Sequence, residues 1–459
     1  MLTYHEALAY IFAFTNFEVT PAGDYTSKTF DLTRMERLLA ALGNPHTQFR
    51  SVHVAGTKGK GSTAAMIENV LRAAGHSTGL YTSPHLHTFR ERIRVGGALI
   101  SPDEVIAGLE KLQPLAAQIP GMTTFEIMTA LAFDYFRARG VDIAVLEVGL
   151  GGRLDATNVV TPLVSVLTAI SYDHTAILGS TLTQIAREKA GIIKPDIPVV
   201  TSPQNDEALS VIAKTAREKN APLIEISSDL EFQLAQVGFQ ITPGESSLES
   251  QKFTLSRQPE NPDLSLSTLE LQINLLGRHQ LANAATALAA LFALRDQGIA
   301  IPDRALRDGL AHVEWHGRFE ILSRHPFLIV DGAHNADSAR RLVATLRELF
   351  PRAQPHFIFG ASGDKDIAGM FSELLPAARS LILTRSHNPR AADPARLAPI
   401  ATPYNVETST APDVATALYE AQRRAHRDDV ICITGSLFVV AEARAAWLAE
   451  QGIAVETDS

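Results

Sequence analysis

Short runs of β-branched and other apolar residues recur along the chain from residue 50. Each is followed by a glycine or polar turn and then by a stretch with helical spacing. Four such runs come early, at residues 51–56, 76–83, 142–149 and 163–171. Strands that alternate with helices indicate βαβ units and a mainly parallel sheet. In such sheets ligands bind beyond the carboxyl ends of the strands, so the residues that follow each run are the first candidates for chemistry.

The pattern differs on either side of this first series. Residues 5–15 and 31–42 carry apolar positions at helical spacing, and a loop containing Gly, Thr and Ser joins them. From about 225 to 275 polar and apolar residues alternate around the polar segment 242–251. That alternation predicts an antiparallel β excursion with a solvated loop.

A second series of strands and helices follows an alanine-rich helix at 281–294 and a Pro- and charge-bearing stretch that runs to about residue 317. Two βα series separated by a non-repeating region predict an α/β protein of two domains. The predicted strands of the second series lead into residues 327–335, 355–364, 380–389 and 430–438. We expect an N-terminal domain over 1–312 with a mainly parallel sheet and the antiparallel excursion, a linker over 313–317, and a Rossmann-like C-terminal domain over 318–459.

Composition narrows the class of protein and of partner. The 459 residues are 46% hydrophobic and 20% charged, which is typical of globular chains that fold throughout. Lys plus Arg number 41 and Asp plus Glu 50, so the net charge of −9 argues against a nucleic-acid partner. The single cysteine, Cys432, favours a reducing compartment. No apolar run reaches the roughly 20 residues that span a bilayer, and the start lacks a signal-peptide pattern. We expect a cytoplasmic protein with no membrane partner.

The segment AGTKGKGST, residues 55–63, carries the strongest chemical signal, because it lies between a predicted strand and a predicted helix. Glycines there let backbone N–H groups turn toward a phosphate at a helix N-terminus, and Lys60 can reach the β- and γ-phosphates of a nucleotide. The spacing departs from the usual P-loop, because the glycines are closer together and Gly61 separates the lysine from the hydroxyl residue. The candidate phosphate-binding residues are Gly56, Thr57, Lys58, Gly59, Lys60, Gly61 and Ser62.

Two further side chains follow predicted strands and therefore belong to the same sheet edge. Glu147 ends an apolar strand beside the phosphate loop, and a carboxylate there suits Mg²⁺, which prefers oxygen ligands and bridges to nucleotide phosphates. His174 follows another strand and is a candidate ligand. The turn after Glu147 might suggest a dinucleotide fingerprint, but Leu154 stands where glycine is needed, so we exclude nicotinamide binding. Lys189, taken alone, reads as a solvated helix charge.

The phosphate loop resembles that of the Mur ligase superfamily, and the segment VLEVGLGGRLDATNVV, residues 145–160, narrows the resemblance to folylpolyglutamate and dihydrofolate synthases. Further matches occur in the family's order and extend over most of the chain from about 50 to 438. They are YTSPHL (81–86), SYDHTAILG (171–179), REKAGIIK (187–194), GRHQLANAATALAAL (277–291), HGRFE (316–320), DGAHN (331–335) and TGSLF (434–438).

The resemblance implies roles for individual residues. Lys60, His174 and Lys189 are the implied catalytic residues, with Lys189 carried as a carbamate that helps His174 hold a second Mg²⁺. Ser83 and Glu147 are the implied ligands of the first Mg²⁺. ATP contacts extend to Asn283, Arg318 and Asp331, and His334 and Ser436 lie near the incoming glutamate. The implied folate-side residues are Thr124, Phe125, Glu126, Leu154, Asp155 and Ala156.

The implied reaction is an ATP-dependent ligation in which a substrate carboxylate forms an acyl phosphate that L-glutamate then attacks. We expect a monomeric folylpolyglutamate synthase, and the sequence leaves open whether it also adds glutamate to 7,8-dihydropteroate. The stretch 27–39 resembles the region that helps bind dihydropteroate in bifunctional members, whereas residues 16–26 give no clear match. Two alternatives stay open: a Mur-type ligase acting on a UDP-linked cell-wall precursor, and a nucleotide switch. The second lacks a guanine-reading Asn-Lys-x-Asp sequence.

Overall fold

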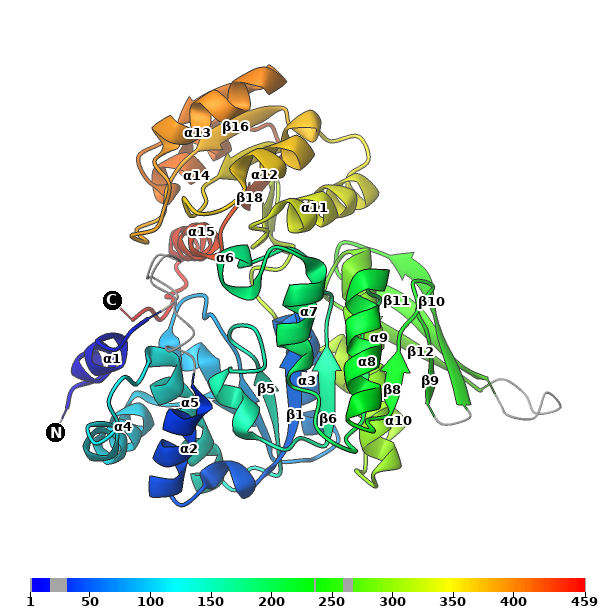
Figure 1. Cartoon of the computed structure of the whole chain (residues 1–459). Coiled ribbons are helices and arrows are strands. Elements are labelled where there is room, and N and C mark those ends of the chain that lie inside the picture. Colours follow the sequence, from blue (N-terminus) through cyan, green and yellow to red (C-terminus); the bar gives the residue numbers. More distant parts are fainter. Residues whose placement is uncertain (1, 17–30, 235–236, 259–266, 459) are drawn as a thin grey trace.

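The computed structural model of the chain describes residues 2–16, 31–234, 237–258 and 267–458. Figure 1 shows two lobes, a smaller one formed by the C-terminal part of the chain and a larger one formed by the rest. Each lobe contains its own mainly parallel sheet, and a separate antiparallel sheet lies at one side of the larger lobe. The predicted fold class, an α/β protein of two domains with a small antiparallel excursion, is confirmed.

The sheet of the larger lobe has eight strands in the order β4-β3-β2-β5-β1-β6-β7-β8. Antiparallel β3 and β4 extend one edge, and the other strands run parallel. Because β1 lies between β5 and β6, the segments that follow these three strands meet at one edge of the sheet, as the sequence predicts. The strands are β1 (Arg50–Ala55), β2 (Thr78–Tyr81), β3 (Ile93–Val95), β4 (Ala98–Leu99), β5 (Ile143–Glu147), β6 (Val164–Leu167), β7 (Val199–Thr201) and β8 (Leu223–Glu225).

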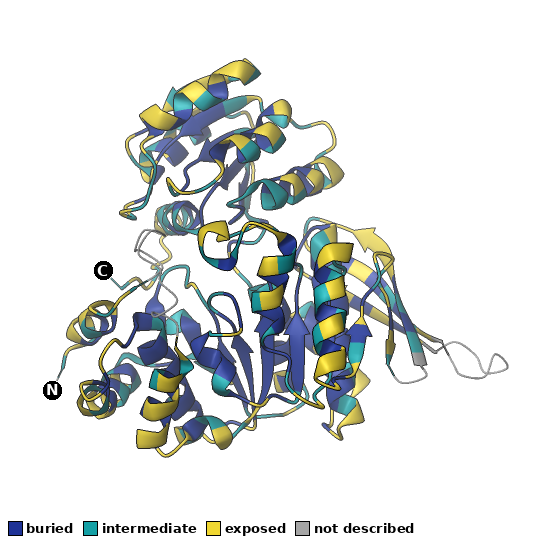
Figure 2. Cartoon of the chain, viewed as in Figure 1, coloured by how far each residue is buried: buried dark blue, intermediate teal, exposed yellow. Residues whose placement is uncertain are grey.

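Helices cover both faces of this sheet, which a parallel sheet requires because its strands are apolar on both sides. Along β5, Ile143 and Val145 belong to one hydrophobic cluster, and Ala144 and Leu146 to another. Figure 2 shows the strands almost entirely buried and the helices exposed on their outer faces. The helices up to residue 220 are α1 (Tyr4–Phe12), α2 (Leu32–Ala41), α3 (Lys60–Ala73), α4 (Pro102–Ala116), α5 (Thr124–Ala138), α6 (Thr175–Leu178), α7 (Leu182–Ala190) and α8 (Asp206–Glu218). Single 3₁₀ turns occur at η2 (Pro45–Thr47), η3 (Phe89–Arg92) and η4 (Ala156–Val159).

The antiparallel excursion is a four-stranded sheet in the order β12-β11-β10-β9. Its strands are β9 (Glu231–Leu234), β10 (Val237–Ser246), β11 (Gln251–Gln258) and β12 (Ser267–Ile273). The polar segment at 242–251 is less of a loop than predicted, because Thr242 and Pro243 pair with Thr254 and Phe253 across the ladder. One face of the sheet is buried and the other is solvated, so these exposed polar residues are compatible with a strand.

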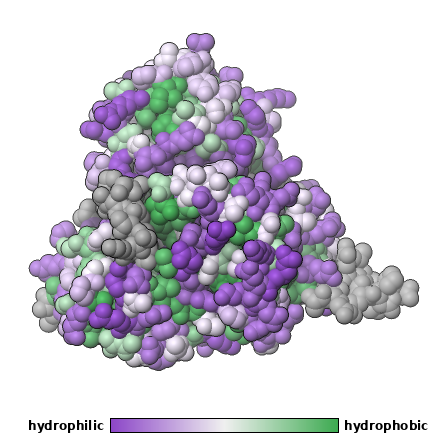
Figure 3. Space-filling model, in the orientation of Figure 1, coloured by the Kyte–Doolittle hydropathy of each residue, from purple (hydrophilic) through white to green (hydrophobic). Residues whose placement is uncertain are grey.

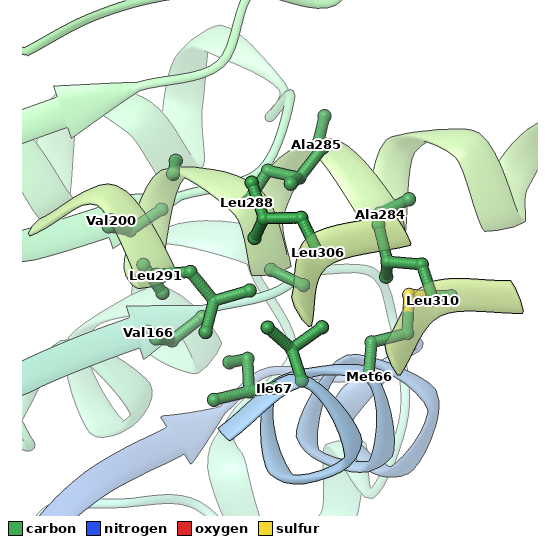
Figure 4. Packing of buried hydrophobic residues seen from close by; sticks show 14 of the residues in the cluster. Met66, Ile67, Val166, Val200, Ala284, Ala285, Leu288, Leu291, Leu306 and Leu310 are labelled. Carbon is green, nitrogen blue, oxygen red and sulfur yellow. The ribbon is translucent and has the colours of Figure 1, made fainter. Parts of the chain in front are cut away.

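Two helices complete the larger lobe, α9 (Arg278–Asp296) and α10 (Asp303–Ala311). The second lies in the stretch whose prolines and charges gave no helical prediction. Figure 4 shows Leu306 and Leu310 of α10 packed beside Met66 and Ile67 of α3. Gly309 permits this approach, since a Cβ at that position would lie 2.5 Å from the Cα of Val70.

The smaller lobe has a six-stranded sheet in the order β13-β14-β18-β15-β16-β17, antiparallel only at β13. Four of its strands match predicted runs. The other two, β13 and β17, are short and largely polar, so the hydrophobic pattern did not predict them. The strands are β13 (Glu320–Arg324), β14 (Phe327–Val330), β15 (His356–Phe359), β16 (Ser380–Leu383), β17 (Glu407–Thr410) and β18 (Val430–Thr434). The helices are α11 (Ala336–Leu349), α12 (Ile367–Leu374), α13 (Pro394–Ala401), α14 (Val414–Arg424) and α15 (Leu437–Glu450), with 3₁₀ turns η5 (Leu375–Ala377) and η6 (Thr402–Tyr404).

The visible face in Figure 3 is mostly hydrophilic, with hydrophobic residues in small patches. None of the helices in the described ranges combines the length and the hydrophobicity that crossing a bilayer requires.

The segment 453–458, which follows α15, returns from the smaller lobe to the larger one. The Asp458 carboxylate accepts hydrogen bonds from the Tyr4 hydroxyl at 3.0 Å, the Thr88 hydroxyl at 2.7 Å and the Phe89 amide at 2.5 Å. Burial and the neighbouring Asp458 raise the pKa of the Tyr4 hydroxyl. This carboxylate therefore ties the smaller lobe to α1 and to the start of η3.

Replacing Asp458 with alanine is expected to lower the free energy of unfolding by about 2 kcal/mol, because three donors lose their shared acceptor. In a thermal melt, the midpoint of unfolding should fall by several degrees. Asp428→Ala, at an exposed turn position, is the matched control and should leave the midpoint unchanged. Equal midpoints for the two variants would mean that the carboxylate adds nothing to stability.

Candidate active site

A cavity of about 400 Å³ lies between the two lobes. Its walls come from the phosphate loop, from the segments after β5 and β6, from the start of α9, and from the loops after β14 and β18 in the smaller lobe. These are the carboxyl ends of parallel strands in both sheets, where ligands bind in such folds. The two sheets therefore present their functional edges to one shared space.

The phosphate loop places its glycines where no side chain fits. Gly59 has φ +88°, and a Cβ there would lie 2.3 Å from the Asn283 side-chain oxygen. Gly56 has φ +148°, and a Cβ there would lie 1.9 Å from the Thr168 hydroxyl oxygen. Helix α3 starts at Lys60, so its free N–H groups face the cavity beside the lysine. The loop thus has the backbone of a phosphate site, and Asn283 from α9 lies against it.

Replacing Gly59 with alanine is expected to weaken nucleotide binding at least tenfold. The new methyl group meets Asn283 and also carries the cost of a positive φ, roughly 1–2 kcal/mol. Gly43→Ala is the matched control, since Gly43 has φ +80° and nothing within 4 Å of the built Cβ. Nucleotide affinity measured by calorimetry should fall only in Gly59→Ala. A similar loss in both variants would point to global destabilisation instead.

Glu147, at the end of β5, faces Lys60 in the cavity. Its Oε1 lies 3.8 Å from the Lys60 ammonium, and its Oε2 accepts a hydrogen bond from the Ser83 amide at 3.2 Å. Burial raises the pKa of Glu147, and the Lys60 charge opposes that rise. Among the described residues no hydrogen bond reaches Oε1. A cavity-lining carboxylate oxygen is chemically suited to a hard cation such as Mg²⁺, and Ser83 lines the same cavity.

Lys189, on α7, is buried, with 5% of its surface exposed, so its reading as a solvated helix charge is wrong. Its ammonium donates a hydrogen bond to the Gly56 carbonyl at 2.8 Å. Burial lowers the pKa of Lys189 to about 7, and the nearby Lys60 charge acts in the same direction. A lysine in such surroundings is partly neutral near pH 7, which makes its nitrogen a nucleophile.

Asp173 contacts charged residues of both lobes, and no role was predicted for it from the sequence. It accepts hydrogen bonds from Lys58 of the phosphate loop at 2.9 Å and from Lys365 of the smaller lobe at 3.1 Å. Burial alone raises the pKa of Asp173, but His334, Lys58 and the other neighbouring charges hold it well below its usual range. Asp173 is therefore an anion between two lysines, one from each lobe.

The two predicted histidines of the site are both neutral. His334 accepts a hydrogen bond from Lys58 at its Nε2, 2.8 Å away, and its Nδ1 donates to the Gly332 carbonyl at 2.8 Å. The Lys58 charge, followed by burial, lowers the pKa of His334 to about 4. His174, with φ +48° at the start of α6, has a pKa lowered to about 4 by burial. A neutral imidazole is the form that binds a metal, and His174 lines the cavity.

The smaller lobe contributes the remaining predicted residues. Asp331 accepts hydrogen bonds from the Phe319 and Ala333 amides, both at 2.9 Å, and burial raises its pKa. The Arg318 side chain lies in the cavity wall, and burial lowers its pKa. Ser436 lines the cavity at the start of α15. In the described ranges no three His, Cys, Asp or Glu side chains are placed so that they could hold a metal ion by themselves.

Five of the six predicted folate-side residues line the same cavity. Phe125, Glu126, Leu154, Asp155 and Ala156 all line it. The Thr124 side chain does not, because its hydroxyl donates to the Ile11 carbonyl at 3.0 Å and the Phe14 carbonyl at 3.1 Å. The neighbouring Thr123 caps α5 and does line the cavity. The dihydropteroate-binding stretch inferred at 27–39 lies in part outside the described residues; within it, Arg34 pairs with Glu126 at 3.1 Å.

Comparison with protein-family models matches residues 54–291 to the Mur ligase middle domain and residues 317–437 to the Mur ligase glutamate ligase domain. A Bacillus subtilis protein named dihydrofolate synthase/folylpolyglutamate synthase is 36% identical over 96% of this chain and 98% of its own length. A Haloferax volcanii protein named probable bifunctional folylpolyglutamate synthase/dihydropteroate synthase is 38% identical over 97% of this chain, and the chain covers 51% of its length.

Among solved structures, Escherichia coli FolC in complex with DHPP and ADP is similar with a TM-score of 0.83 and 31% identity. The likeness covers 98% of this chain and 99% of that one. Similarity in sequence and in three-dimensional structure thus extends over both lobes.

Proposed function

The chain belongs to the folylpolyglutamate synthase and dihydrofolate synthase family of the Mur ligases, and from that membership we propose that it adds L-glutamate to the γ-carboxylate of tetrahydrofolate. It is an ATP-dependent ligase that uses Mg²⁺. The observation that carries the proposal is that one cavity brings these groups together. Lys60 and Glu147, Phe125 and Asp155, and His334 of the smaller lobe all line it.

The reaction needs two steps. A folate carboxylate oxygen attacks the γ-phosphorus of ATP, the bond to the β,γ-bridging oxygen breaks, and ADP leaves. The glutamate amino group then attacks the acyl phosphate carbon, loses a proton, and expels phosphate as the amide forms. Phosphoryl transfer depends chiefly on positioning and on neutralising charge. Lys60 and the N-terminus of α3 supply positive potential at the phosphates, and Lys58 lies beside them.

We assign the first Mg²⁺ to Ser83 and Glu147, because these residues offer oxygen ligands at the phosphate end. Magnesium bound there would neutralise phosphate charge. A second ion at His174 and a carbamate on Lys189 belong to the same proposal. A third buried cation beside Lys60 and Lys58 is electrostatically unfavourable, whereas a carbamate replaces that cation with an anion. The carbamate forms when the neutral amine adds to CO₂ and releases one proton.

The smaller lobe holds the glutamate and excludes water in this proposal. His334 and Ser436 line its wall, and the Lys58–Asp173–Lys365 contact joins it to the phosphate loop. Asn283 and Arg318 contact ATP from the two sides of the boundary, together with Asp331. An acyl phosphate hydrolyses in water, so a closed cavity protects the intermediate. We further propose that the domains meet at 313–317 and that the enzyme acts as a cytoplasmic monomer without nucleic acid or membrane.

A two-substrate assay tests the function. ADP release is measured with ATP, Mg²⁺ and L-glutamate, and with either a monoglutamyl tetrahydrofolate or 7,8-dihydropteroate as acceptor. We expect glutamate-dependent ADP release with tetrahydrofolate. Release with dihydropteroate adds the second activity, which the names of bifunctional relatives favour. Turnover only with a UDP-linked cell-wall acceptor, or nucleotide hydrolysis that ignores glutamate, contradicts the proposal.

A further inference from the structure

A buried histidine lies behind the folate end of the cavity. His53, in the middle of β1, is fully buried, and its Nε2 lies 2.8 Å from the Thr157 hydroxyl oxygen. The same hydroxyl contacts Oδ1 of Asp155, which lines the cavity. Three side chains from two distant segments thus form a chain of hydrogen bonds that ends at the cavity wall.

The direction of this chain is fixed by counting donors. His53 Nδ1 is buried and has no hydrogen-bond partner. A proton on Nδ1 would leave a buried donor unsatisfied, which costs roughly 1–3 kcal/mol. The proton therefore belongs on Nε2, which donates to Thr157, and the single Thr157 hydroxyl proton is left to donate to Asp155. Burial lowers the pKa of His53 to about 3, so the ring stays neutral.

Asp155 receives donors from several sides. Its Oδ1 also accepts a hydrogen bond from the Thr157 amide at 3.0 Å, and its Oδ2 accepts one from the Leu150 amide at 2.9 Å. Burial raises the pKa of Asp155, and these donors oppose that rise. They favour the carboxylate, which accepts hydrogen bonds, over the acid, which would donate one.

The Leu150 turn also connects Asp155 to Phe125. Gly149 precedes Leu150, and a Cβ on Gly149 would lie 2.5 Å from the Phe125 ring. The turn thus packs directly against the aromatic wall of the cavity while its next amide donates to Asp155. Asp155 and the Phe125 ring are therefore both in contact with the same turn.

We propose that His53 and Thr157 are positioning residues for the folate subsite, holding Asp155 in one orientation as an acceptor for N–H groups of the pteridine ring. The inference rests on the proposed function and adds two residues that do not touch the substrate. Asp155 is also the N-cap residue of η4, where its side chain accepts a hydrogen bond from the Thr157 amide, and that cap needs no group beyond Thr157. The donor from β1, the strand that leads into the phosphate loop, is what the cap does not require.

The test compares shape-matched variants. Thr157→Val removes the hydroxyl and keeps the branched shape, whereas Thr157→Ser keeps the hydroxyl. His53→Leu removes the ring donor, whereas His53→Gln keeps an N–H at similar reach. We expect Thr157→Val and His53→Leu to raise the KM for tetrahydrofolate about tenfold. The kcat and the KM for ATP of these two variants should stay within twofold of the wild-type values. Thr157→Ser and His53→Gln should keep a folate KM close to that of the wild type.

Other patterns overturn the inference. An unchanged folate KM in Thr157→Val and His53→Leu, or equal rises for folate and ATP, leaves these residues with a structural role only. If Thr157→Val or His53→Leu fails to fold in thermal melts, the inference is tested with the two variants at the other position. Turnover of the wild type separates the two hypotheses. If the wild type shows no folate-dependent ADP release, the proposed function fails. If the wild type is active and the variants keep its folate KM, only the positioning role of His53 and Thr157 is refuted.

Discussion

Lys60→Ala is expected to lower the turnover number for glutamate-dependent ADP release by about a thousandfold. Lys60 is the first residue of α3, where the helix N-terminus and the phosphate loop face the cavity. Its ammonium also lies 3.8 Å from the buried Glu147 carboxylate. Removing it takes away a charge aimed at the transferred phosphate and leaves Glu147 without its nearest cation, so the variant loses transition-state stabilisation more than substrate binding.

Steady-state kinetics with nucleotide affinity measured in parallel checks this result. Lys60→Arg keeps the charge but changes its shape, and we expect an intermediate rate. Lys214→Ala is the control, because Lys214 lies on the outer face of α8 with 73% of its side chain exposed. If Lys60→Ala keeps its turnover number within tenfold of the wild type, the phosphate role assigned to Lys60 is wrong.

Lys189→Ala should reduce turnover by about a hundredfold or more, and added formate or acetate should recover part of it. The reason is charge. A carbamate at this position would supply two oxygens near His174, and a small carboxylate can enter the space that the shortened side chain vacates. Because burial brings the pKa of Lys189 to about 7, the amine is mostly protonated at pH 6 and mostly neutral at pH 8. Carbamylation, and with it the activity of the wild type, should therefore rise over that interval.

Lys194→Ala provides the matched control for rescue. Lys194 follows the same helix and donates to the Asn158 carbonyl at 2.7 Å, away from the phosphate loop. Formate should have no effect on this variant. Carbon NMR of the wild type equilibrated with labelled bicarbonate should reveal a carbamate signal that Lys189→Ala lacks. Full activity of Lys189→Ala without added carboxylate would eliminate the role.

Features that depend on a few neighbouring residues could be predicted from the sequence. The phosphate loop, the strands on either side of it and the carboxylate at the end of β5 follow from short patterns, and parallel pairing brings them to one edge. Thr124, which the family resemblance assigned to the folate side, does not line the cavity. The capping box of Thr123 and Glu126 starts α5 at Thr124, which turns the Thr124 hydroxyl toward the Ile11 and Phe14 carbonyls.

Long-range contacts were beyond reach without the structure. The Asp173–Lys365 pair joins residues 192 positions apart in different lobes, and no periodicity reports such a meeting. Lys189 reads as solvated because α7 is amphipathic and charged, yet its side chain is directed inward to the Gly56 carbonyl. The family resemblance implied a role for Lys189. Only the structure shows the burial and the neighbouring Lys60 charge that lower the pKa of its ammonium group.

The return of residues 453–458 to the larger lobe has a mechanical consequence. The chain crosses between lobes after α10, and the Asp458 carboxylate fastens the smaller lobe a second time at Tyr4, Thr88 and Phe89. Other contacts between the lobes join Arg444 to His87 at 3.1 Å and Arg278 to Glu348 at 3.5 Å. While Asp458 keeps its three donors, the last residues of the described chain stay attached to the larger lobe. A movement of the smaller lobe must then be accommodated by residues 451–457, which form no helix or strand.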